Sequence, residues 1–209
     1  MLEIDTPHGP ARAHLQVPVT PIGALVLGHG AGGGVSAPDL VAVTEVARSA
    51  GFSVARIEQP YRVARRRSPA PAHQLDESWR AAIEHLRSRE LRALALIVGG
   101  RSSGARVACR TVGDTGAVAV LCLAFPLHPP GRPEKTRQPE LDAVRAPALV
   151  VQGARDPFGI PAARAGHTVV TVSGNHSLKG DLDAVAAAVR DWLARITAGL
   201  EAKPSRPAG

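Results

Sequence analysis

Residues 94–110 read LALIVGGRSSGARVACR, and this stretch decides the fold class. An apolar run comes first and apolar residues at helical spacing come last, which predicts a strand, a tight turn and a helix. The turn, residues 100–104, reads GRSSG and matches G-x-S-x-G. Glycines are needed around a serine on a strained strand-to-helix turn, because a Cβ there would collide with its neighbours. Ser102 is therefore a candidate nucleophile, and an ordinary Gly/Ser turn that caps the helix is the alternative.

A second glycine-rich turn follows the strand expected at Ala24–Leu27. Residues 28–34 read GHGAGGG. A turn early in the chain can supply one backbone N–H to an oxyanion, and the residue after the nucleophile supplies another. We expect the N–H groups of Ala31 and Ser103 to do so, each donor being worth about 3 kcal/mol. Ser103 is also the rival nucleophile, but the G-x-S-x-G register centres on Ser102.

The same turn matches a dinucleotide-binding fingerprint. Gly28, Gly30 and Gly33 have the G-x-G-x-x-G spacing, after a strand and before an expected helix. Glu58 ends the next expected strand, where such proteins place an acidic residue. A nucleotide-binding protein of the Rossmann type is therefore an alternative, and residues outside the turn must separate the two.

Two later strand ends supply the groups that a nucleophilic serine needs. Asp156 follows the strand expected at Ala148–Gln152, and His176 follows the strand expected at Thr168–Val172. Serine, acid and histidine then occur in the chain order that a G-x-S-x-G nucleophile turn requires. We expect His176 to take the proton of Ser102, while Asp156 holds the imidazole tautomer and stabilises the imidazolium. Each assignment is weak alone, but three strand ends deliver the three groups in the required order.

Other polar residues have less specific signals. His29 is expected to shape the oxyanion turn or bind substrate, with a packing role as the alternative. His128, in a proline-rich connection, is expected to line the cleft and bind substrate, with ordinary loop structure as the alternative. Solvated surface positions are expected for three residues, namely His167, Asp142 and Asp114. No cluster has metal-ligand spacing, so the sequence calls for neither a metal nor a cofactor.

The composition fits one compact domain. Of 209 residues, 44% are hydrophobic and 21% are charged, and this length allows a sizeable core. Only 3% are aromatic, so the core must be built mainly from Val, Leu, Ala and Ile. The net charge is +7, but the arginines are mostly scattered and are not interleaved with stacking aromatics. Nucleic-acid binding is therefore not favoured.

The cysteines and the N-terminus indicate the compartment. Cys109 and Cys122 lie in apolar segments without C-x-x-C spacing, which predicts buried free thiols and a reducing environment. The N-terminus has no apolar core of signal-peptide length, and no segment approaches the roughly 18 apolar residues of a membrane span. We expect a soluble cytoplasmic protein without a membrane partner, and its oligomeric state stays open.

Short apolar runs alternate with segments of helical spacing, as in a parallel sheet covered on both faces. The expected strands are Ala24–Leu27, Phe52–Ile57, Ala93–Val98, Ala117–Ala124, Ala148–Gln152 and Thr168–Val172. The expected helices are Leu40–Ala50, a segment N-capped by Asp76, and Asp181–Thr197. The prediction is a doubly wound α/β fold, a mostly parallel sheet flanked by helices. Residues 1–199 form its single domain, and residues 200–209 form a flexible tail.

Two proline-rich connections, Gln59–His73 and Pro126–Pro139, are expected to be irregular and to lie over the edge of the sheet that carries the candidate site. The first contains four arginines between residues 62 and 67. Arg62 comes shortly after the strand expected at Phe52–Ile57. It is expected to bind an anionic acyl substrate, and a solvated charge run is the alternative. Neither connection is long enough to form a separate lid domain.

The chain resembles the α/β-hydrolase superfamily and, more narrowly, the small dienelactone-hydrolase-like proteins. The resemblance is carried, between residues 25 and 180, by LVLGHGAGGG, EQPYR, GGRSSGARVA, FPLHPPGRPEK, LVVQGARDPFG and GNHSLKG. Within these proteins it is similar to a branch that includes a subunit of a eukaryotic histone-acetyltransferase complex. The resemblance implies Ser102, Asp156 and His176 as the catalytic triad. True dienelactone hydrolases have a cysteine where this chain has Ser102, so lactone specificity is not implied.

These observations predict a serine hydrolase that cleaves an ester, thioester or similar acyl bond of a small-molecule substrate through an acyl-Ser102 intermediate. A noncatalytic interaction or scaffold protein that retains the same fold is the first alternative. The nucleotide-binding protein is the second.

Overall fold

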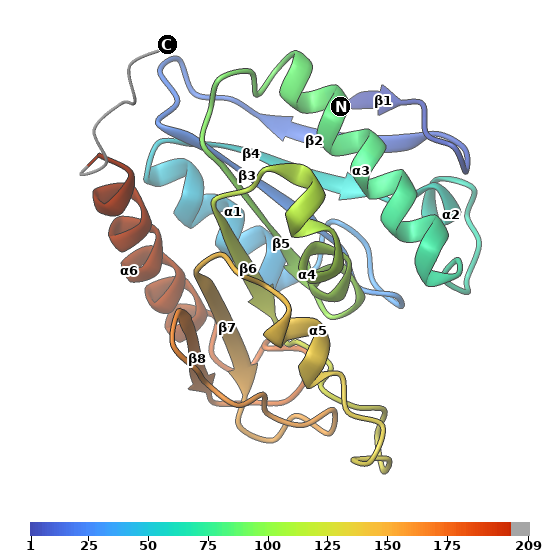
Figure 1. Cartoon of the computed structure of the whole chain (residues 1–209), viewed down its shortest axis with the longest axis vertical. Coiled ribbons are helices and arrows are strands. Elements are labelled where there is room, and N and C mark those ends of the chain that lie inside the picture. Colours follow the sequence, from blue (N-terminus) through green and yellow to red (C-terminus); the bar gives the residue numbers. More distant parts are fainter. Residues whose placement is uncertain (202–209) are drawn as a thin grey trace.

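The computed structural model describes residues 1–201, which form an eight-stranded sheet with helices on both faces (Figure 1). The strands are β1 (Leu2–Ile4), β2 (Ala11–Gln16), β3 (Gly23–Gly28), β4 (Phe52–Glu58), β5 (Leu96–Arg101), β6 (Ala119–Leu123), β7 (Ala148–Gly153) and β8 (His167–Val172). Their order across the sheet is β1-β2-β4-β3-β5-β6-β7-β8. β2 is antiparallel to both of its neighbours, and the strands from β4 to β8 run parallel. The predicted doubly wound, mostly parallel fold is confirmed.

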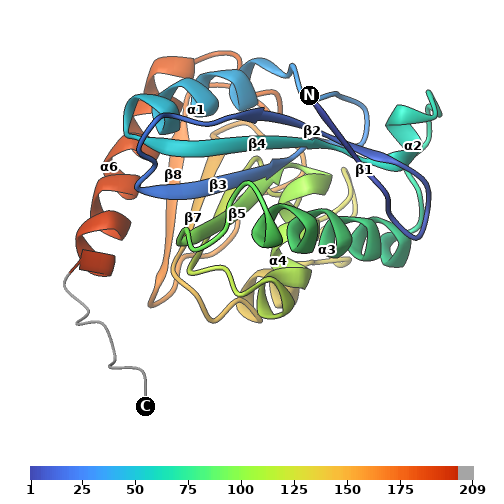
Figure 2. The same cartoon turned by 90° about the horizontal axis from the view of Figure 1, so that it is seen from above.

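Helices cover the sheet in two layers. They are α1 (Pro38–Ser49), α2 (Pro60–Val63), α3 (Ala72–Ser88), α4 (Ser103–Thr115), α5 (Gln138–Asp142) and α6 (Leu182–Glu201). α1 and α6 pack against one face, and α3, α4 and α5 cover the other (Figure 2). None of these helices, within residues 1–201, combines the length and apolar composition needed to cross a membrane. α6 runs to Glu201, so the expected tail at 200–209 begins inside the helix, and residues 202–209 lie outside the described residues.

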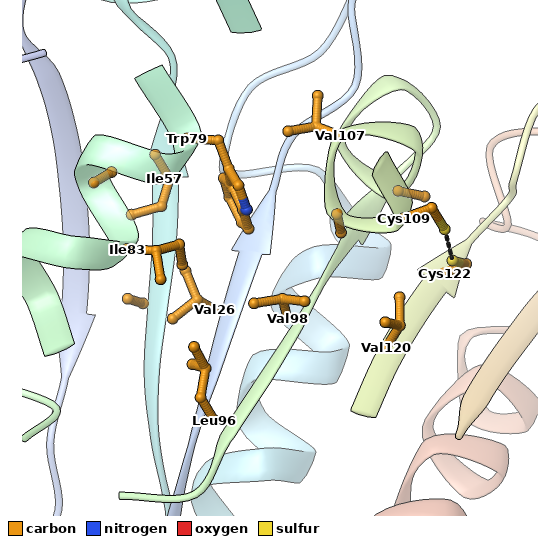
Figure 3. Packing of buried hydrophobic residues seen from close by; sticks show 14 of the residues in the cluster. Val26, Ile57, Trp79, Ile83, Leu96, Val98, Val107, Cys109, Val120 and Cys122 are labelled. Atoms are coloured by element: carbon orange, nitrogen blue, oxygen red, sulfur yellow. Dashed lines mark hydrogen bonds between the residues drawn. The ribbon is translucent and has the colours of Figure 1, made fainter. Parts of the chain in front are cut away.

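Alternating side chains of the central strands fill two separate cores. In β3, Val26 belongs to the core under α3 and α4, whereas Leu25 and Leu27 belong to the core under α1 and α6. Figure 3 shows Trp79 of α3 directed toward the sheet, in the same cluster as Val26 and Val98. A parallel sheet buried on both faces needs apolar residues at successive positions, because successive side chains point to opposite faces.

The two cysteines lie side by side in the first of these cores. Cys109 is on α4 and Cys122 is on β6, with their sulfur atoms 3.5 Å apart (Figure 3). Both residues are buried, and both are free thiols. The contact with Cys122, together with burial, raises the pKa of the Cys109 thiol well above its usual range. The prediction of buried free thiols is confirmed.

The strand before the nucleophile turn lies three residues later than expected. The apolar pattern indicates Ala93–Val98, but β5 spans Leu96–Arg101. Gly99 continues the strand, and a Cβ on it would collide with the backbone oxygen of Leu121 in β6. The glycine therefore permits a close approach of two strands and does not end the first one.

The N-terminal hairpin of β1 and β2 leaves little signal in the sequence. β2 alternates between buried and partly exposed residues, but its buried positions hold only Ala11 and Ala13. Small side chains give a weak hydrophobic pattern, so the strand is hard to recognise before its partner β4 is known.

Asp76 does not cap a helix, contrary to expectation. α3 already begins at Ala72, after Pro71, and Asp76 lies in its second turn. Its carboxylate accepts two hydrogen bonds from Arg110 of α4, at 2.8 and 2.6 Å. The pairing with Arg110 of α4, 34 residues later in the sequence, accounts for an acidic residue at this position better than local capping does.

His167 is buried, not solvated as expected. It begins β8, and its Nε2 lies 3.0 Å from the backbone oxygen of Val144. The Nε of Arg164 donates to its Nδ1 at 3.1 Å. Burial lowers the pKa of His167, so the ring is held neutral between these partners. Asp142 and Asp114 are exposed, as expected.

Candidate active site

The turn between β5 and α4 carries Ser102 in a strained backbone conformation. Ser102 has φ 53° and ψ −112°, and its N–H donates to the backbone oxygen of Leu123 in β6 at 2.9 Å. A Cβ on Gly100 would lie 2.5 Å from the backbone oxygen of Gly28, and one on Gly104 would collide with the same atom. Glycine is therefore required on both sides of the serine, because β3 touches the turn. This packing holds Ser102 at the edge of the sheet, with its side chain lining a cleft.

His176, in the loop after β8, connects Ser102 to Asp156. Its Nε2 is 2.9 Å from Ser102 Oγ, and its Nδ1 is 2.8 Å from Asp156 Oδ2. In the neutral tautomer with a proton on Nδ1, the ring donates to the carboxylate and accepts from the serine hydroxyl. The Asp156 side chain is fully buried and that of His176 is 18% exposed, so the relay opens to solvent at its serine end.

Asp156 and His176 are held by two residues that the sequence did not single out. Gln152, at the end of β7, donates from Nε2 to Asp156 Oδ2 at 2.8 Å. The backbone N–H of Phe158 donates to Oδ1 at 2.9 Å. The Phe158 ring also lies against the His176 ring, with centroids 4.2 Å apart. A polar Gln152 in an otherwise apolar buried strand was the available signal.

The two residues predicted to supply the oxyanion donors line the same cleft as Ser102. Ala31 is in the loop after β3, and Ser103 is the first residue of α4. Tyr61 of α2 donates from its hydroxyl to the backbone oxygen of Ala31 at 3.1 Å. This bond ties the backbone of the loop to α2.

His29 supports the loop and does not line the cleft. The residue is 3% exposed. Its Nδ1 donates to the backbone oxygen of Gly30 at 2.8 Å, and its Nε2 accepts the backbone N–H of Gln59 at 3.1 Å. Burial lowers the pKa of His29, as this neutral pairing requires. The structure therefore favours the loop-shaping role over direct substrate contact.

Arg101 contacts three parts of the site at once, which the sequence did not reveal. Its Nε donates to Oδ2 of the fully buried Asp39 in α1 at 2.8 Å. Its Nη2 donates to the backbone oxygen of His176 at 3.0 Å. Its Nη1 packs over Gly30, where a Cβ would lie only 2.9 Å away. Burial raises the pKa of Asp39 in spite of the opposing guanidinium.

The cleft around Ser102 has a volume of about 680 Å³ and is strongly cationic. Its charged lining residues are Arg101, Arg106, Arg137, Lys179 and Asp39. The connection after β6 contributes Pro126 and Arg137 to the wall, as its expected position over the site edge implies. His128 of the same connection lies against Gly159 instead, where an added Cβ would be 2.5 Å from its Nε2. Its Nδ1 lies 2.9 Å from the oxygen of Pro129, and it is absent from the cleft lining.

Arg62 lies next to the glycine-rich loop, at the margin of the cleft. A Cβ on Gly34 would be 4.0 Å from Arg62 Nη2, and Gly34 itself lines the cleft. Arg66, further along the same basic segment, lines a separate cavity of about 390 Å³ with His8 and Gln59. Substrate binding by Arg62 stays a prediction, and Arg65, Arg66 and Arg67 are exposed and do not line the cleft.

The structural context of the dinucleotide fingerprint is missing. In that motif the glycine turn opens directly into a helix, whose N-terminus binds the pyrophosphate. Here α1 begins at Pro38, five residues after Gly33, and Gly28 packs against Gly104 of α4. Glu58 lies 3.8 Å from His14 of β2. The glycine-rich turn therefore packs against the nucleophile turn and does not lead directly into a helix. Across residues 1–201, no group of three or more His, Cys, Asp or Glu side chains is placed to hold a metal ion.

A serine, a histidine and a buried aspartate at the carboxyl ends of parallel strands are the arrangement typical of α/β-hydrolases. The family described as "Alpha/beta hydrolase domain" matches residues 21–188, and the chain belongs to it. Sequence-based recognition of this superfamily is confirmed.

Solved structures with the same fold include a serine hydrolase described as having no lid. The chain is similar to an α/β serine hydrolase without lid from Xanthomonas campestris, with 20% identity, a TM-score of 0.75 and coverage of 99% of this chain and 95% of that one. It is also similar to Est1E from Butyrivibrio proteoclasticus with bound ferulic acid, at 16% identity, TM-score 0.77 and coverage of 95% and 100%. A dienelactone hydrolase from Anabaena variabilis matches at 19% identity, TM-score 0.73 and coverage of 93% and 95%. At these identities the likeness shows the fold.

Proposed function

We propose that this protein is a serine hydrolase that cleaves an ester, thioester or similar acyl bond through an acyl-Ser102 intermediate. The observation that carries the proposal is the hydrogen-bonded relay of 2.9 Å from Ser102 to His176 and 2.8 Å from His176 to Asp156. Its serine end opens into a cleft large enough for a small acyl substrate.

In the acylation step, His176 Nε2 takes the Ser102 proton as Oγ attacks the substrate carbonyl carbon. The tetrahedral oxyanion is stabilised by the backbone N–H groups of Ala31 and Ser103. The buried carboxylate of Asp156 accepts a hydrogen bond from Nδ1–H of the imidazolium, and it keeps the proton on Nδ1 when the ring is neutral. The intermediate then collapses, the bond to the leaving group breaks, and His176 gives its proton to the leaving oxygen or sulfur.

Deacylation repeats the sequence with water as the nucleophile. His176 takes a proton from water, whose oxygen attacks the acyl carbon, and then returns that proton to Ser102 Oγ as the acid leaves. Lys179 and Ser177 line the cleft beside His176, so this side is polar. Water therefore has a polar route to the acyl-enzyme.

The sequence resemblance refines the proposal without naming a substrate. We infer a carboxylesterase-type activity of the dienelactone-hydrolase-like kind, in a protein related to the branch with the histone-acetyltransferase-complex subunit. The free thiols of Cys109 and Cys122 fit a reducing compartment, and we infer the cytoplasm.

Labelling with a fluorophosphonate, followed by peptide mapping, tests the nucleophile. We expect wild type to be labelled at Ser102 and to hydrolyse short para-nitrophenyl esters. Ser102→Ala removes both, because loss of such a nucleophile can lower kcat on the order of a millionfold. Ser103→Ala is the matched control, since it keeps the backbone N–H that the mechanism uses and loses only the hydroxyl.

Two results would overturn the proposal. One is labelling that moves to Ser103, which would place the nucleophile in the wrong register. The other is a folded wild type that is unlabelled and inert on all esters tested, which would favour the noncatalytic interaction protein. Tight binding of a nicotinamide dinucleotide would instead favour the nucleotide-binding alternative.

A further inference from the structure

Arg106 and Arg137 line the cleft and belong to a cluster of side chains at α3, α4 and α5 that contains more guanidinium groups than carboxylates. Arg106 binds Glu140 through two hydrogen bonds, one of them 2.8 Å from Nε to Oε2. Arg110 binds Asp76 in the same two-point manner and also lies 3.5 Å from Glu140. The carboxylates of Asp76 and Glu140 are therefore already paired with Arg106 and Arg110. Arg137 is the third guanidinium of this group.

Arg137 is anchored to the wall but has no carboxylate partner among residues 1–201. Its Nη1 donates to the backbone oxygen of Pro126 at 2.9 Å, and both residues line the cleft with Ser102. Burial and the neighbouring charge of Arg106 lower the pKa of Arg137, against the opposing charge of nearby Glu140, which forms no ion pair with it. A half-buried guanidinium that keeps unused N–H donors in a cleft is stabilised when an anion accepts hydrogen bonds from them.

A second cation lies in the loop that carries the candidate base. Lys179 is exposed, lines the same cleft and forms no ion pair within the part of the chain described by the structure. Asp39, the acidic residue of the lining, is already bound by Arg101. The cleft therefore presents two uncompensated positive charges to whatever binds at Ser102.

We propose that Arg137 binds a carboxylate on the acyl portion of the substrate, so that half-esters of dicarboxylic acids are the favoured substrate class. This inference rests on the proposed function. Arg137 is the specificity-determining residue because its planar fork matches a carboxylate in a two-point geometry. Lys179 adds a screened, less directional attraction.

The test compares two esters of equal acyl length, the para-nitrophenyl monoester of glutaric acid and para-nitrophenyl valerate. The measured quantity is the ratio of their kcat/KM values, because a general defect of the variant cancels in the ratio. Arg137→Gln is expected to lower the ratio at least tenfold, mainly through KM for the charged ester. Arg137→Lys is expected to restore part of it, and added salt is expected to lower the wild-type ratio.

Arg132→Gln is the matched control, because Arg132 is exposed in the same segment and lies outside the cleft lining. It removes the same charge and is expected to leave the ratio within about twofold, since a distant surface charge is screened by salt. An equal loss on both esters in Arg137→Gln would overturn the inference, and so would an equal fall of the ratio in Arg132→Gln.

A binding measurement separates this inference from the proposed hydrolysis. Calorimetric titration of glutarate into Ser102→Ala requires no turnover. We expect binding that is lost in Ser102→Ala/Arg137→Gln and retained in Ser102→Ala/Arg132→Gln. Binding with this pattern and an inert wild type would keep the anion site and reject the hydrolase. An active wild type without glutarate binding and without a preference for the charged ester would reject the anion site and keep the hydrolase.

Discussion

The nucleophile turn and the loop that lies over it are both glycine-rich, but their glycines have opposite surroundings. In the turn, a Cβ on Gly100 or Gly104 would meet the backbone oxygen of Gly28 at collision distance. In the loop, a Cβ on Gly32 or Gly33 would meet nothing within 4 Å. The turn needs glycine because β3 and α4 touch there. Gly32 and Gly33 instead leave open space along the cleft lining.

This difference shows that a glycine motif has two separate physical meanings. Gly32 and Gly33 are not among the residues with positive φ, so other side chains fit their backbone conformation. Only glycine at positions 100 and 104 allows Ser102 to take up its position in the turn between β5 and α4. The turn therefore sets the position of the nucleophile, and the loop sets how much room a substrate has.

The largest effect is expected for Gly104→Ala. The new methyl group must push β3 and α4 apart, because its neighbours are backbone atoms that cannot rotate away. We expect the free energy of unfolding to fall by about 1–3 kcal/mol or more. We also expect Ser102 to lose fluorophosphonate labelling. Urea unfolding and labelling of the folded fraction measure the two effects separately.

Two matched alanine substitutions isolate the collision. Gly113 lies in the same helix α4, and a Cβ there meets nothing within 4 Å. Gly113→Ala and Gly33→Ala are each expected to leave stability unchanged or raise it by up to about 1 kcal/mol, because alanine restricts the unfolded chain. If Gly104→Ala were as stable as Gly113→Ala, the close contact of β3 and α4 would not be what demands the glycine.

An intermediate effect is expected for Arg101, which links the turn to the loop and to the base. Arg101→Met removes the bonds to Asp39 and to the backbone of His176, so the imidazole is less well placed. Small misplacements of catalytic groups can lower rates by up to about a hundredfold. We expect kcat to fall roughly tenfold to a hundredfold, with little change in KM, and Arg101→Lys to recover part of the loss. Steady-state kinetics on a neutral ester measure this split.

Arg80→Met is the control for this positioning role. Arg80 also binds an aspartate, Asp114, at 2.6 Å, but on the surface and far from the cleft lining. Its loss is expected to change neither kcat nor KM. A rise in KM with unchanged kcat in Arg101→Met would show that Arg101 contacts substrate, and that its contact with His176 has no role in placing the base.

The candidate site was predictable where a residue directly follows a strand. Ser102, Asp156 and His176 come after β5, β7 and β8, and parallel strands end at one edge of the sheet. Local sequence therefore indicates which side chains share an edge before their distances are known. The alternation of buried strands and helices predicted the layers for the same reason.

Long-range pairing was not predictable in this way. Arg101 lies 62 residues from Asp39 and 75 from His176, and no local pattern records either contact. Local sequence predicts a capping role for Asp76, whereas its partner, Arg110, is on another helix. A histidine near a loop is expected to be solvated, but His167 is buried because the backbone oxygen of Val144 pairs with its Nε2.

The smallest effect expected here is a loss of stability at mildly acidic pH, and one of its two sources is on the loop side of the comparison. His29, which holds the loop, and His167 at the start of β8 both have pKa values lowered by burial. In the unfolded chain these rings take up protons below about pH 6.5. The unfolded state therefore binds more protons than the folded state in this range, and stability decreases as pH falls.

Urea unfolding at about pH 7.5 and about pH 5.5, on either side of the ordinary histidine pKa, measures the effect. His29→Gln and His167→Gln are each expected to reduce the difference in unfolding free energy between the two conditions. His29→Gln is also expected to lower ester turnover, because the ring bonds to Gly30 and Gln59 beside the oxyanion loop. His167→Gln, remote from the cleft lining, is not. If the acid-induced loss were the same in wild type and in the variant with both changes, these two rings would not be its source. The loop would then be held by Tyr61 and by its own turn, independently of a neutral His29.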